Sequence, residues 1–329
     1  MPQRTKKPQA ELHAHLGSSV NPGILWSIAH RQGIKLPTKN YWEFEEMITM
    51  GEGKKNKNLD QMHNNFFHWT ELIQSSPEAI LESVKSVISG AYVKSNVVLH
   101  ELRFNPMFRN RGGERDLDYI IMSAIWGMEQ AVLEHPQIKA GLILMADRQQ
   151  PLESGQIIFS KAIKYANRGV IGVDIAGPER KSFSMKASKP FFEKIRQARL
   201  GITVHTGEAG SLEELKFVVR EICPHRIGHG VKAYLDKKLM ADIVKQKIVL
   251  ELCPTSNLKN SVIKNYKEMR KIYRVLLKAG IRLTINTDGP EMYRTHLLNE
   301  QQILFKNGIF SQKEIDQCVK WAFEASFVR

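Results

Sequence analysis

Two histidines near the start of the chain have the spacing of a shared metal site. His13 and His15 flank one alanine at the end of an apolar run. In a strand, residues two apart point to the same face, so both imidazoles would face one side. This pair alone is a weak signal, because polar residues also end strands that bind nothing.

Four further polar residues strengthen the signal, because each lies where an apolar run gives way to a glycine-containing loop. They are His205, Glu208, His229 and Asp288. Three neutral imidazoles and one carboxylate make a reasonable zinc set. Zinc lowers the pKa of a bound water towards neutrality, which yields a nucleophile. A histidine and a glutamate outside the ligand set are suited to move protons.

Eight short, β-branched runs are predicted to be the strands that position these residues. They span 10–16, 97–104, 140–146, 170–176, 201–205, 226–231, 248–252 and 281–287. Stretches with helical spacing lie between most of them, for example 161–167, 191–199, 212–222, 236–246 and 268–278. This alternation predicts an α/β protein with a parallel sheet, and eight strands fit one (β/α)8 TIM barrel. The polar residues then meet at the carboxyl ends of the strands, where barrel enzymes place their active sites.

A helical insertion is predicted after the first strand, at about residues 21–95. The gap between the first two strands is far longer than one crossover helix requires. Asn21 and Ser76 each precede a proline, which is typical of a helix start. No boundary is clear enough to divide the chain, so we expect a single domain over residues 1–329.

The composition is that of an ordinary soluble globular protein. Hydrophobic residues make up 42% and charged residues 25%, which excludes a mainly disordered chain. The net charge of +14 indicates anionic partners in general. Three cysteines without CxxC spacing exclude a zinc ribbon and a disulfide scaffold. Without an apolar leader or a membrane-length apolar run, we expect a cytoplasmic protein.

Seven motifs occur in a fixed order along nearly the whole chain. They are Glu11-Leu-His-Ala-His-Leu16, Glu101-Leu-Arg-Phe104 with Pro106, Gly172-Val-Asp-Ile-Ala-Gly-Pro-Glu179, His205-Thr-Gly-Glu208, Arg226-Ile-Gly-His-Gly230, Glu251-Leu-Cys-Pro-Thr-Ser-Asn257 and Thr287-Asp288. Together they resemble the adenosine deaminase family of the metal-dependent amidohydrolases. No single motif decides this, but their order and spacing match throughout.

The resemblance implies the role of each residue. One Zn2+ ion per chain would be bound by His13, His15, His205 and Asp288. Asp288 and His229 would hold the attacking water, with His229 as base or electrostatic stabiliser. Protonated Glu208 would give its proton to N1 of a 6-aminopurine, while the backbone of Gly177 lies against the N3 edge. Water would add to C6 and ammonia would leave, giving a 6-oxopurine. Glu208 then needs a raised pKa, which a partly dry pocket supplies.

Two glycines depart from the family pattern and leave the substrate open. Members that act on adenosine carry an aspartate where Gly17 stands, and it reads the ribose 5′-hydroxyl. A second aspartate, which hydrogen-bonds N7, is replaced by Gly289. The resemblance implies an adenosine-like nucleoside as substrate. The alternatives are a 5′-modified or anionic derivative, such as aminodeoxyfutalosine or an adenosine nucleotide, and adenine itself.

Two rival functions are weighed against deamination. A basic nucleic-acid-binding protein fits the charge, but the lysines and arginines are spread along the chain and no binding motif appears. A zinc hydrolase of amides or esters would share the barrel and differ in its product. We therefore expect a small purine partner, with no nucleic acid and no membrane, and leave the oligomeric state open.

Other residues receive structural interpretations. Glu101 and Arg103 are predicted to pair with each other near the second strand, because a buried arginine needs a carboxylate. Cys253 is interpreted as a buried structural thiol. The aromatic residues of the insertion are expected to pack helices on the barrel, with one or two contacting substrate. They are Trp26, Phe66, Phe67 and Trp69.

Overall fold

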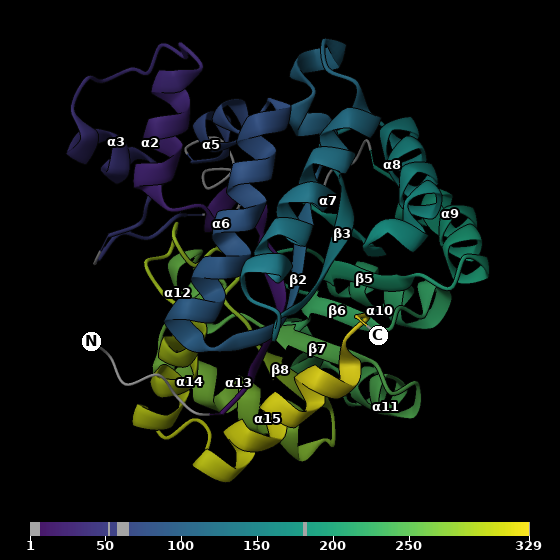
Figure 1. Ribbon diagram of the computed structural model, residues 1–329. Helices are drawn as coiled ribbons and strands as arrows, with labels where there is room; N and C mark the ends of the chain where they lie inside the picture. Colours follow the sequence, from purple (N-terminus) through teal and green to yellow (C-terminus); the bar gives the residue numbers. More distant parts are fainter. Residues whose placement is uncertain (1–6, 52, 58–65, 180–182, 329) are drawn as a thin grey trace.

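Eight parallel strands form one sheet in which each strand pairs with the next along the chain (Figure 1). The computed structural model describes residues 7–51, 53–57, 66–179 and 183–328. The strands are β1 (Gln9–His15), β2 (Val97–Phe104), β3 (Lys139–Asp147), β4 (Val170–Ala176), β5 (Gly201–Thr206), β6 (Arg226–His229), β7 (Val249–Leu252) and β8 (Arg282–Ile285). All eight predicted strands are confirmed.

The sheet nearly closes on itself between its first strand and the segment after β8. His15 N–H donates to the Asp288 carbonyl and Asp288 N–H donates to the His13 carbonyl, each at 2.8 Å. These bonds place a predicted metal ligand of the last strand beside two of the first. The predicted (β/α)8 TIM barrel is confirmed.

Side chains alternate along each strand between the helical layer and the barrel interior. On β5, the buried Ile202 and Val204 belong to the hydrophobic core under the helices, whereas the Thr203 hydroxyl donates to the Glu251 carboxylate. On β2, Leu102 belongs to that core. The interior of the barrel is therefore polar towards the carboxyl ends of its strands.

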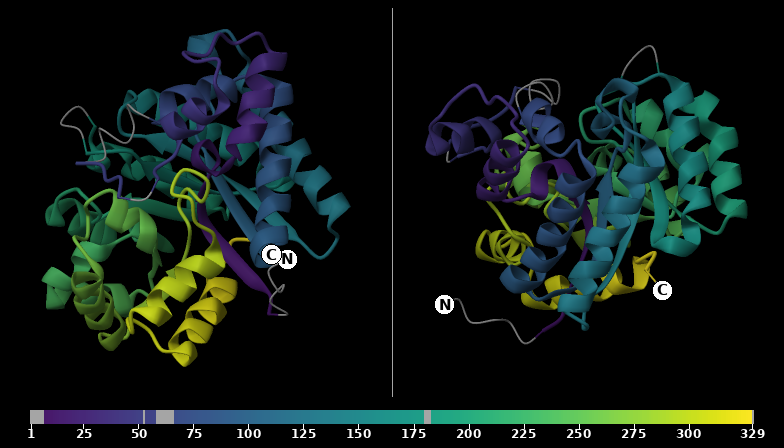
Figure 2. Two further views of the ribbon diagram at one scale, coloured as in Figure 1. Left: turned by 90° about the vertical axis from the view of Figure 1, so that its left-hand side faces the viewer. Right: turned by 45° about the horizontal axis from the view of Figure 1, so that its top comes forward.

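Helices surround the barrel (Figure 2). They are α7 (Leu117–Glu134), α8 (Leu152–Lys164), α9 (Met185–Gln197), α10 (Leu212–Phe217), α11 (Lys237–Lys245), α12 (Pro254–Lys259), α13 (Tyr266–Lys278), α14 (Leu297–Lys306) and α15 (Gln312–Ala325). Two predicted helices begin earlier than expected. The predicted helix 161–167 covers the last turn of α8 and the start of a short 3-10 turn after it, and α9 begins at Met185 because the Ser184 side chain caps it. None of the described helices is long and apolar enough to cross a membrane.

Five described helices lie between β1 and β2, of which the first precedes the predicted insertion at 21–95 and the other four lie within it. They are α1 (Leu16–Ser19), α2 (Pro22–Arg31), α3 (Tyr41–Ile48), α5 (His68–Ile73) and α6 (Pro77–Ser95). Both predicted caps are confirmed, since the Asn21 side chain accepts from Gly23 N–H at 2.9 Å and Ser76 Oγ accepts from Ala79 N–H at 3.2 Å. In Figure 1, α2, α3 and α5 lie beyond the carboxyl ends of the strands. They stand on the side of the barrel where the predicted site lies.

Candidate active site

Three imidazoles converge at the carboxyl ends of β1 and β5. The Nε2 atom of His205 lies 3.1 Å from those of His13 and His15, and the latter two are 3.3 Å apart. Tetrahedral zinc with Zn–N bonds of about 2.0–2.1 Å holds its nitrogen ligands about 3.3 Å from one another. The three nitrogens therefore fit three corners of such a site.

Asp288 supplies the fourth group. Its Oδ1 atom is 3.3 Å from His15 Nε2 and 3.6 Å from His13 Nε2. The Ser256 hydroxyl donates to its Oδ2 atom at 2.5 Å, which fixes the carboxylate. Asp288 has φ +64° and His229 has φ +60°, a backbone region that residues other than glycine rarely adopt. Such strain is concentrated at functional sites, because the surrounding structure must hold it in place.

Carboxylates behind the histidines fix how two of the imidazoles are oriented. His13 Nδ1 lies 2.7 Å from Glu251 Oε2, and His205 Nδ1 lies 2.9 Å from Asp174 Oδ2. A carboxylate that takes the Nδ1 proton leaves Nε2 free to bind a metal. The same two carboxylates flank Arg103, whose guanidinium donates to each at 2.9 Å.

Buried arginines keep the carboxylates behind the histidines ionised. Burial alone would raise the pKa of Glu251, but Arg103 and Arg226 outweigh it and hold that pKa well below its ordinary value. Burial likewise opposes ionisation of Asp174, and His205 and Arg103 lower its pKa. Ionised carboxylates that hold the imidazoles suit a bound cation, in agreement with the nitrogen geometry.

The predicted pair of Glu101 with Arg103 is wrong. Arg103 pairs with Asp174 and Glu251, whereas Glu101 pairs with Arg226 at 2.5 Å. Glu101 and Arg103 do share a face of β2, but they lie two residues apart along the strand and so reach different levels of the barrel. Each finds its partner across the interior on another strand.

Glu208 and His229 lie together next to Asp288. Glu208 Oε2 is 3.7 Å from His229 Nε2, which is 3.9 Å from Asp288 Oδ2. The Asn257 side-chain oxygen, 2.9 Å from His229 Nδ1, takes the proton there and leaves Nε2 as the free nitrogen. Burial raises the pKa of Glu208, which favours the protonated form that general-acid chemistry needs.

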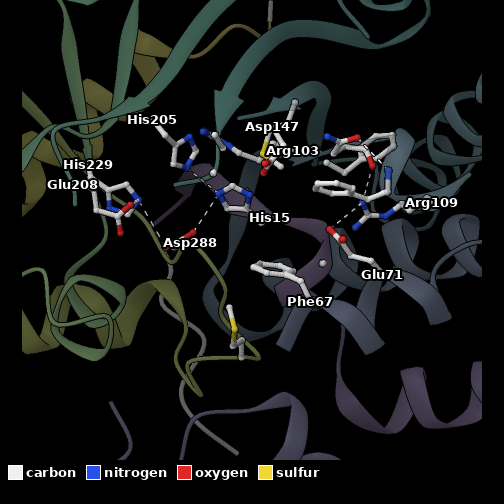
Figure 3. Close-up of a pocket in the computed structure, with 18 of the residues that line it drawn as sticks. His15, Phe67, Glu71, Arg103, Arg109, Asp147, His205, Glu208, His229 and Asp288 are labelled. Carbon is white, nitrogen blue, oxygen red and sulfur yellow. Dashed lines mark hydrogen bonds and ion pairs between the residues drawn. The ribbon is translucent and has the colours of Figure 1, made fainter. Parts of the chain in front are cut away.

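These groups line one pocket with an empty volume of about 670 Å3, its open mouth included (Figure 3). Aromatic and methionine side chains form much of the wall. They are Phe67, Phe104, Phe108, Met145 and Met292. A wall of this kind suits a planar aromatic ring, with a few polar groups to orient it. Phe67 is thus the insertion aromatic that lines the pocket, as expected for one or two of them.

The three predicted substrate-binding glycines differ in their positions. Gly17 and Gly177 line the pocket, whereas Gly289 is not among its lining residues. A Cβ atom at Gly289 would lie 2.5 Å from Ser18 Oγ, so the neighbouring serine takes that space. At Gly177, with φ +85°, a Cβ would lie 2.6 Å from the Asp147 carboxylate.

The structure adds pocket residues that the sequence analysis did not single out. Asp147 ends β3 and lines the pocket, as do Glu71 from α5 and Arg109 from the segment after β2. Asp147 was detectable, because it follows the apolar run 140–146 just as the metal ligands follow theirs. Glu71 and Arg109 had no such signal, since they belong to no strand end and no motif. Cys253 is fully buried and its pKa is raised by burial, in agreement with a structural thiol.

The barrel and its histidine–carboxylate cluster are typical of metal-dependent hydrolases. The family model for adenosine deaminase matches residues 8–329. An adenosine deaminase of Clostridium kluyveri is 32% identical over 320 residues, which cover 97% of this chain and 89% of that protein. The chain belongs to the adenosine deaminase family, whose members are hydrolases that act on carbon–nitrogen bonds of cyclic amidines.

Two solved structures share the fold at lower sequence identity. The N6-methyl-AMP deaminase of Arabidopsis thaliana has a TM-score of 0.82 and 22% identity, covering 98% of this chain and 92% of its own. An amidohydrolase of Burkholderia ambifaria with bound zinc has a TM-score of 0.84 and 20% identity, covering 98% and 86%. Family membership supports aminopurine deaminase activity and a bound metal.

Proposed function

We propose that this protein is a zinc-dependent hydrolytic deaminase of a 6-aminopurine nucleoside. One observation carries the proposal. His15, His205, Glu208 and His229 lie at one side of a pocket walled largely by aromatic rings, and Nε2 of His13 is within 3.3 Å of those of His15 and His205. Family membership supports the reaction class, and the zinc-bound neighbour supports the metal.

The residues have separate tasks in this proposal. The three histidines and Asp288 hold the zinc, which when bound activates a water as nucleophile at neutral pH. His229 Nε2 orients that water or takes its proton. This nitrogen is unprotonated because Nδ1 carries the ring proton and donates it to the Asn257 side-chain oxygen. Protonated Glu208 donates to N1 of the purine, which makes C6 more electrophilic. Water then adds to C6 and ammonia leaves.

A metal and substrate screen tests the proposal. We expect one zinc per chain in the purified protein, and ammonia release with a shift in purine absorbance on adding an aminopurine nucleoside. Chelation should abolish ammonia release and added zinc should restore it. His229→Ala should abolish turnover with the fold and the zinc content retained. Absence of stoichiometric metal, or no ammonia from any aminopurine, contradicts the proposal.

A second candidate concerns the substrate alone. The aspartate that would read a 5′-hydroxyl is absent at Gly17, and a side chain there would meet the Phe67 ring at 3.0 Å. The absence of this aspartate removes a hydroxyl partner and a negative charge from the pocket, which favours a nucleoside whose 5′ position is modified or anionic. The name of the Arabidopsis relative, a deaminase of a nucleotide, agrees with this candidate. Adenosine, adenine and adenosine 5′-monophosphate in the screen distinguish these substrates.

A further inference from the structure

Arg109 is the one fully buried arginine of the described residues that lacks a close carboxylate partner. The others, Arg103, Arg148 and Arg226, each contact a carboxylate at 2.9 Å or less. Each of these three also makes at least three hydrogen bonds. A buried guanidinium is ordinarily paired in this way, because leaving the charge without acceptors is costly.

The contacts of Arg109 are few. Within the described residues its single hydrogen bond runs from Nη1 to the Asn105 carbonyl at 2.8 Å. The nearest carboxylate oxygen belongs to Glu71, at 3.8 Å, which is beyond hydrogen-bond distance. The Phe104 ring lies 5.6 Å from the guanidinium carbon. The remaining donors of Arg109 therefore need acceptors that these residues do not supply.

The guanidinium faces the substrate pocket from the side away from the metal ligands. Arg109 and Glu71 line the same pocket as His15, Glu208 and Asp288, and Figure 3 shows them on opposite sides of it. Nη2 of Arg109 lies 3.4 Å from where a Cβ of residue 17 would be. Because residue 17 is glycine, it places no side chain of its own beside this donor, and the Phe67 ring lies against the same position at 3.0 Å. A substrate with its reacting end at the metal site would present its other end here.

Glu71 neutralises the charge of Arg109 only when its own carboxyl is ionised. Burial raises the pKa of Glu71 to about 7, with Arg109 opposing this rise and Asp147 adding to it. Near neutral pH this carboxyl is often protonated, and then it is a hydrogen-bond donor rather than a competing anion. An anionic group bound at Arg109 would favour that protonated form further. The two side chains together then offer donors to one acceptor-rich group.

We propose that Arg109 is a specificity-determining residue that binds an anionic group, a phosphate or a carboxylate, at the end of the substrate remote from the reacting amine. This rests on the proposed deaminase function and narrows it to an anionic aminopurine derivative. Guanidinium groups suit both anions, because their planar fork pairs with two oxygens at once. The metal site and Glu208 would act alike on neutral and anionic substrates, so Arg109 sets the choice between them.

Selectivity measurements test the proposal. The quantity is kcat/KM for adenosine 5′-monophosphate, and for an adenosine with a 5′-carboxylate, each divided by kcat/KM for adenosine. We expect the zinc-loaded protein to prefer one of the anionic substrates, and Arg109→Gln to lower that ratio by about 10- to 100-fold, as charge-assisted hydrogen bonds allow. Arg109→Lys should retain part of it. Arg115→Gln, an exposed charge on the nearby segment, should leave the ratio unchanged. The preferred anion identifies phosphate or carboxylate.

A binding measurement separates failure of this inference from failure of the proposed function. Calorimetry of the zinc-loaded protein with inosine 5′-monophosphate, inosine 5′-carboxylate and inosine needs no turnover. We expect one anionic ligand to bind more tightly than inosine, with the difference lost in Arg109→Gln. If aminopurines are deaminated but both the selectivity ratio and the affinity difference are absent, or survive in Arg109→Gln, the role of Arg109 is wrong. If no aminopurine is deaminated, the proposed function fails instead.

Discussion

At the scale of single residues, the test of the proton-transfer assignment is Glu208. Its carboxyl is buried beside His229, and burial favours its protonated form. Glu208→Gln keeps the shape but cannot give up a proton, so we expect kcat to fall by about 100- to 10,000-fold. Zinc content should stay at the wild-type level, because Glu208 is not in the ligand set. A kcat within tenfold of wild type would show that another group supplies the proton.

Glu71 predicts how substrate selectivity depends on pH. Its pKa is raised to about 7, chiefly by burial, and Arg109 and Asp147 are the charged groups that act on it. As pH rises through this value, Glu71 ionises, pairs with Arg109 and repels a bound anion. The ratio of kcat/KM for the 5′-carboxylate substrate to that for adenosine should therefore fall from about pH 6 to about pH 9. The 5′-carboxylate of the substrate itself, with an ordinary pKa of roughly 3 to 4, keeps its charge over that range.

The ratio isolates this residue, because both substrates share the same metal site and proton-transfer groups. Glu71→Gln should hold the ratio at its low-pH value throughout. Glu114→Gln removes an exposed carboxyl from the chain segment that follows Arg109, and it should leave the pH profile as in wild type. If wild type and Glu71→Gln show the same pH profile, the titrating group is another one.

Individual residues also show where prediction from sequence stops. The convergence of His13, His205 and Asp288, the proposed ligands, was predictable because each lies at the end of an apolar run, and a barrel gathers such ends at one face. The partners that orient them were not, because the spacing of residues does not show that Glu251 on β7 reaches His13 on β1 across the interior, or that Asp174 on β4 reaches His205 on the neighbouring β5. Arg103 was assigned the wrong partner for the same reason. Pairing inside a barrel depends on the level each side chain reaches, which spacing alone does not give.

At the scale of elements, the segment after α15 closes the lower end of the barrel interior. The Phe327 N–H donates to Glu101 at 2.5 Å, and its ring lies 3.6 Å from the Arg226 guanidinium carbon. Arg226 in turn contacts Glu251, which orients His13. Sequence analysis predicted the eight strands from their apolar runs but missed this segment. Residues 326–328 carry no periodic pattern, and their role depends on the barrel they enter.

A double-mutant cycle tests this packing. A Cβ at Gly201 would lie 2.1 Å from the Phe327 ring, so Gly201→Ala should lower the free energy of unfolding by about 1–3 kcal/mol. Phe327→Ala should cost about 2 kcal/mol, since the ring is half-buried. The double variant should lose at least about 1 kcal/mol less unfolding free energy than the two single variants together, because Phe327→Ala removes the ring that Gly201→Ala would meet. Urea unfolding provides the values.

Gly90→Ala supplies the matched control, since a Cβ there meets nothing within 4 Å. Its combination with Phe327→Ala should be additive within about 0.5 kcal/mol. Additive behaviour of Gly201→Ala with Phe327→Ala as well would mean that the ring does not sit over β5 in solution.

At the scale of the whole molecule, the net charge of +14 indicated anionic partners without locating them. Among the described residues, four arginines that contribute to it are fully buried, and three of these have close carboxylate partners. The total charge is therefore a poor guide to the ligand. The more informative feature is Arg109, the buried arginine that lacks a close carboxylate partner among the described residues. Only the folded structure shows it.

Stability across pH provides a test that involves the molecule as a whole. Glu300 on α14 joins the first turn of α12 to the loop before α14, accepting from Thr255 N–H at 2.9 Å and from the Thr295 hydroxyl at 2.5 Å. Burial raises its pKa to about 7, against an ordinary value of 4.5. The folded protein thus holds a proton that the unfolded chain releases between these values. Its contribution to stability is complete below pH 4.5 and is lost as pH rises through about 7.

Glu300→Gln removes this titration while keeping the shape of the side chain. Relative to the variant, we expect the free energy of unfolding of the wild-type protein to fall by up to about 3 kcal/mol between about pH 5 and about pH 8. Urea unfolding of both proteins with the metal chelated gives the difference, in which titrations of the histidine cluster cancel. A constant offset between the two curves would mean that Glu300 is ionised throughout. The hydroxyls of Thr255 and Thr295 would then outweigh the cost of burying its charge.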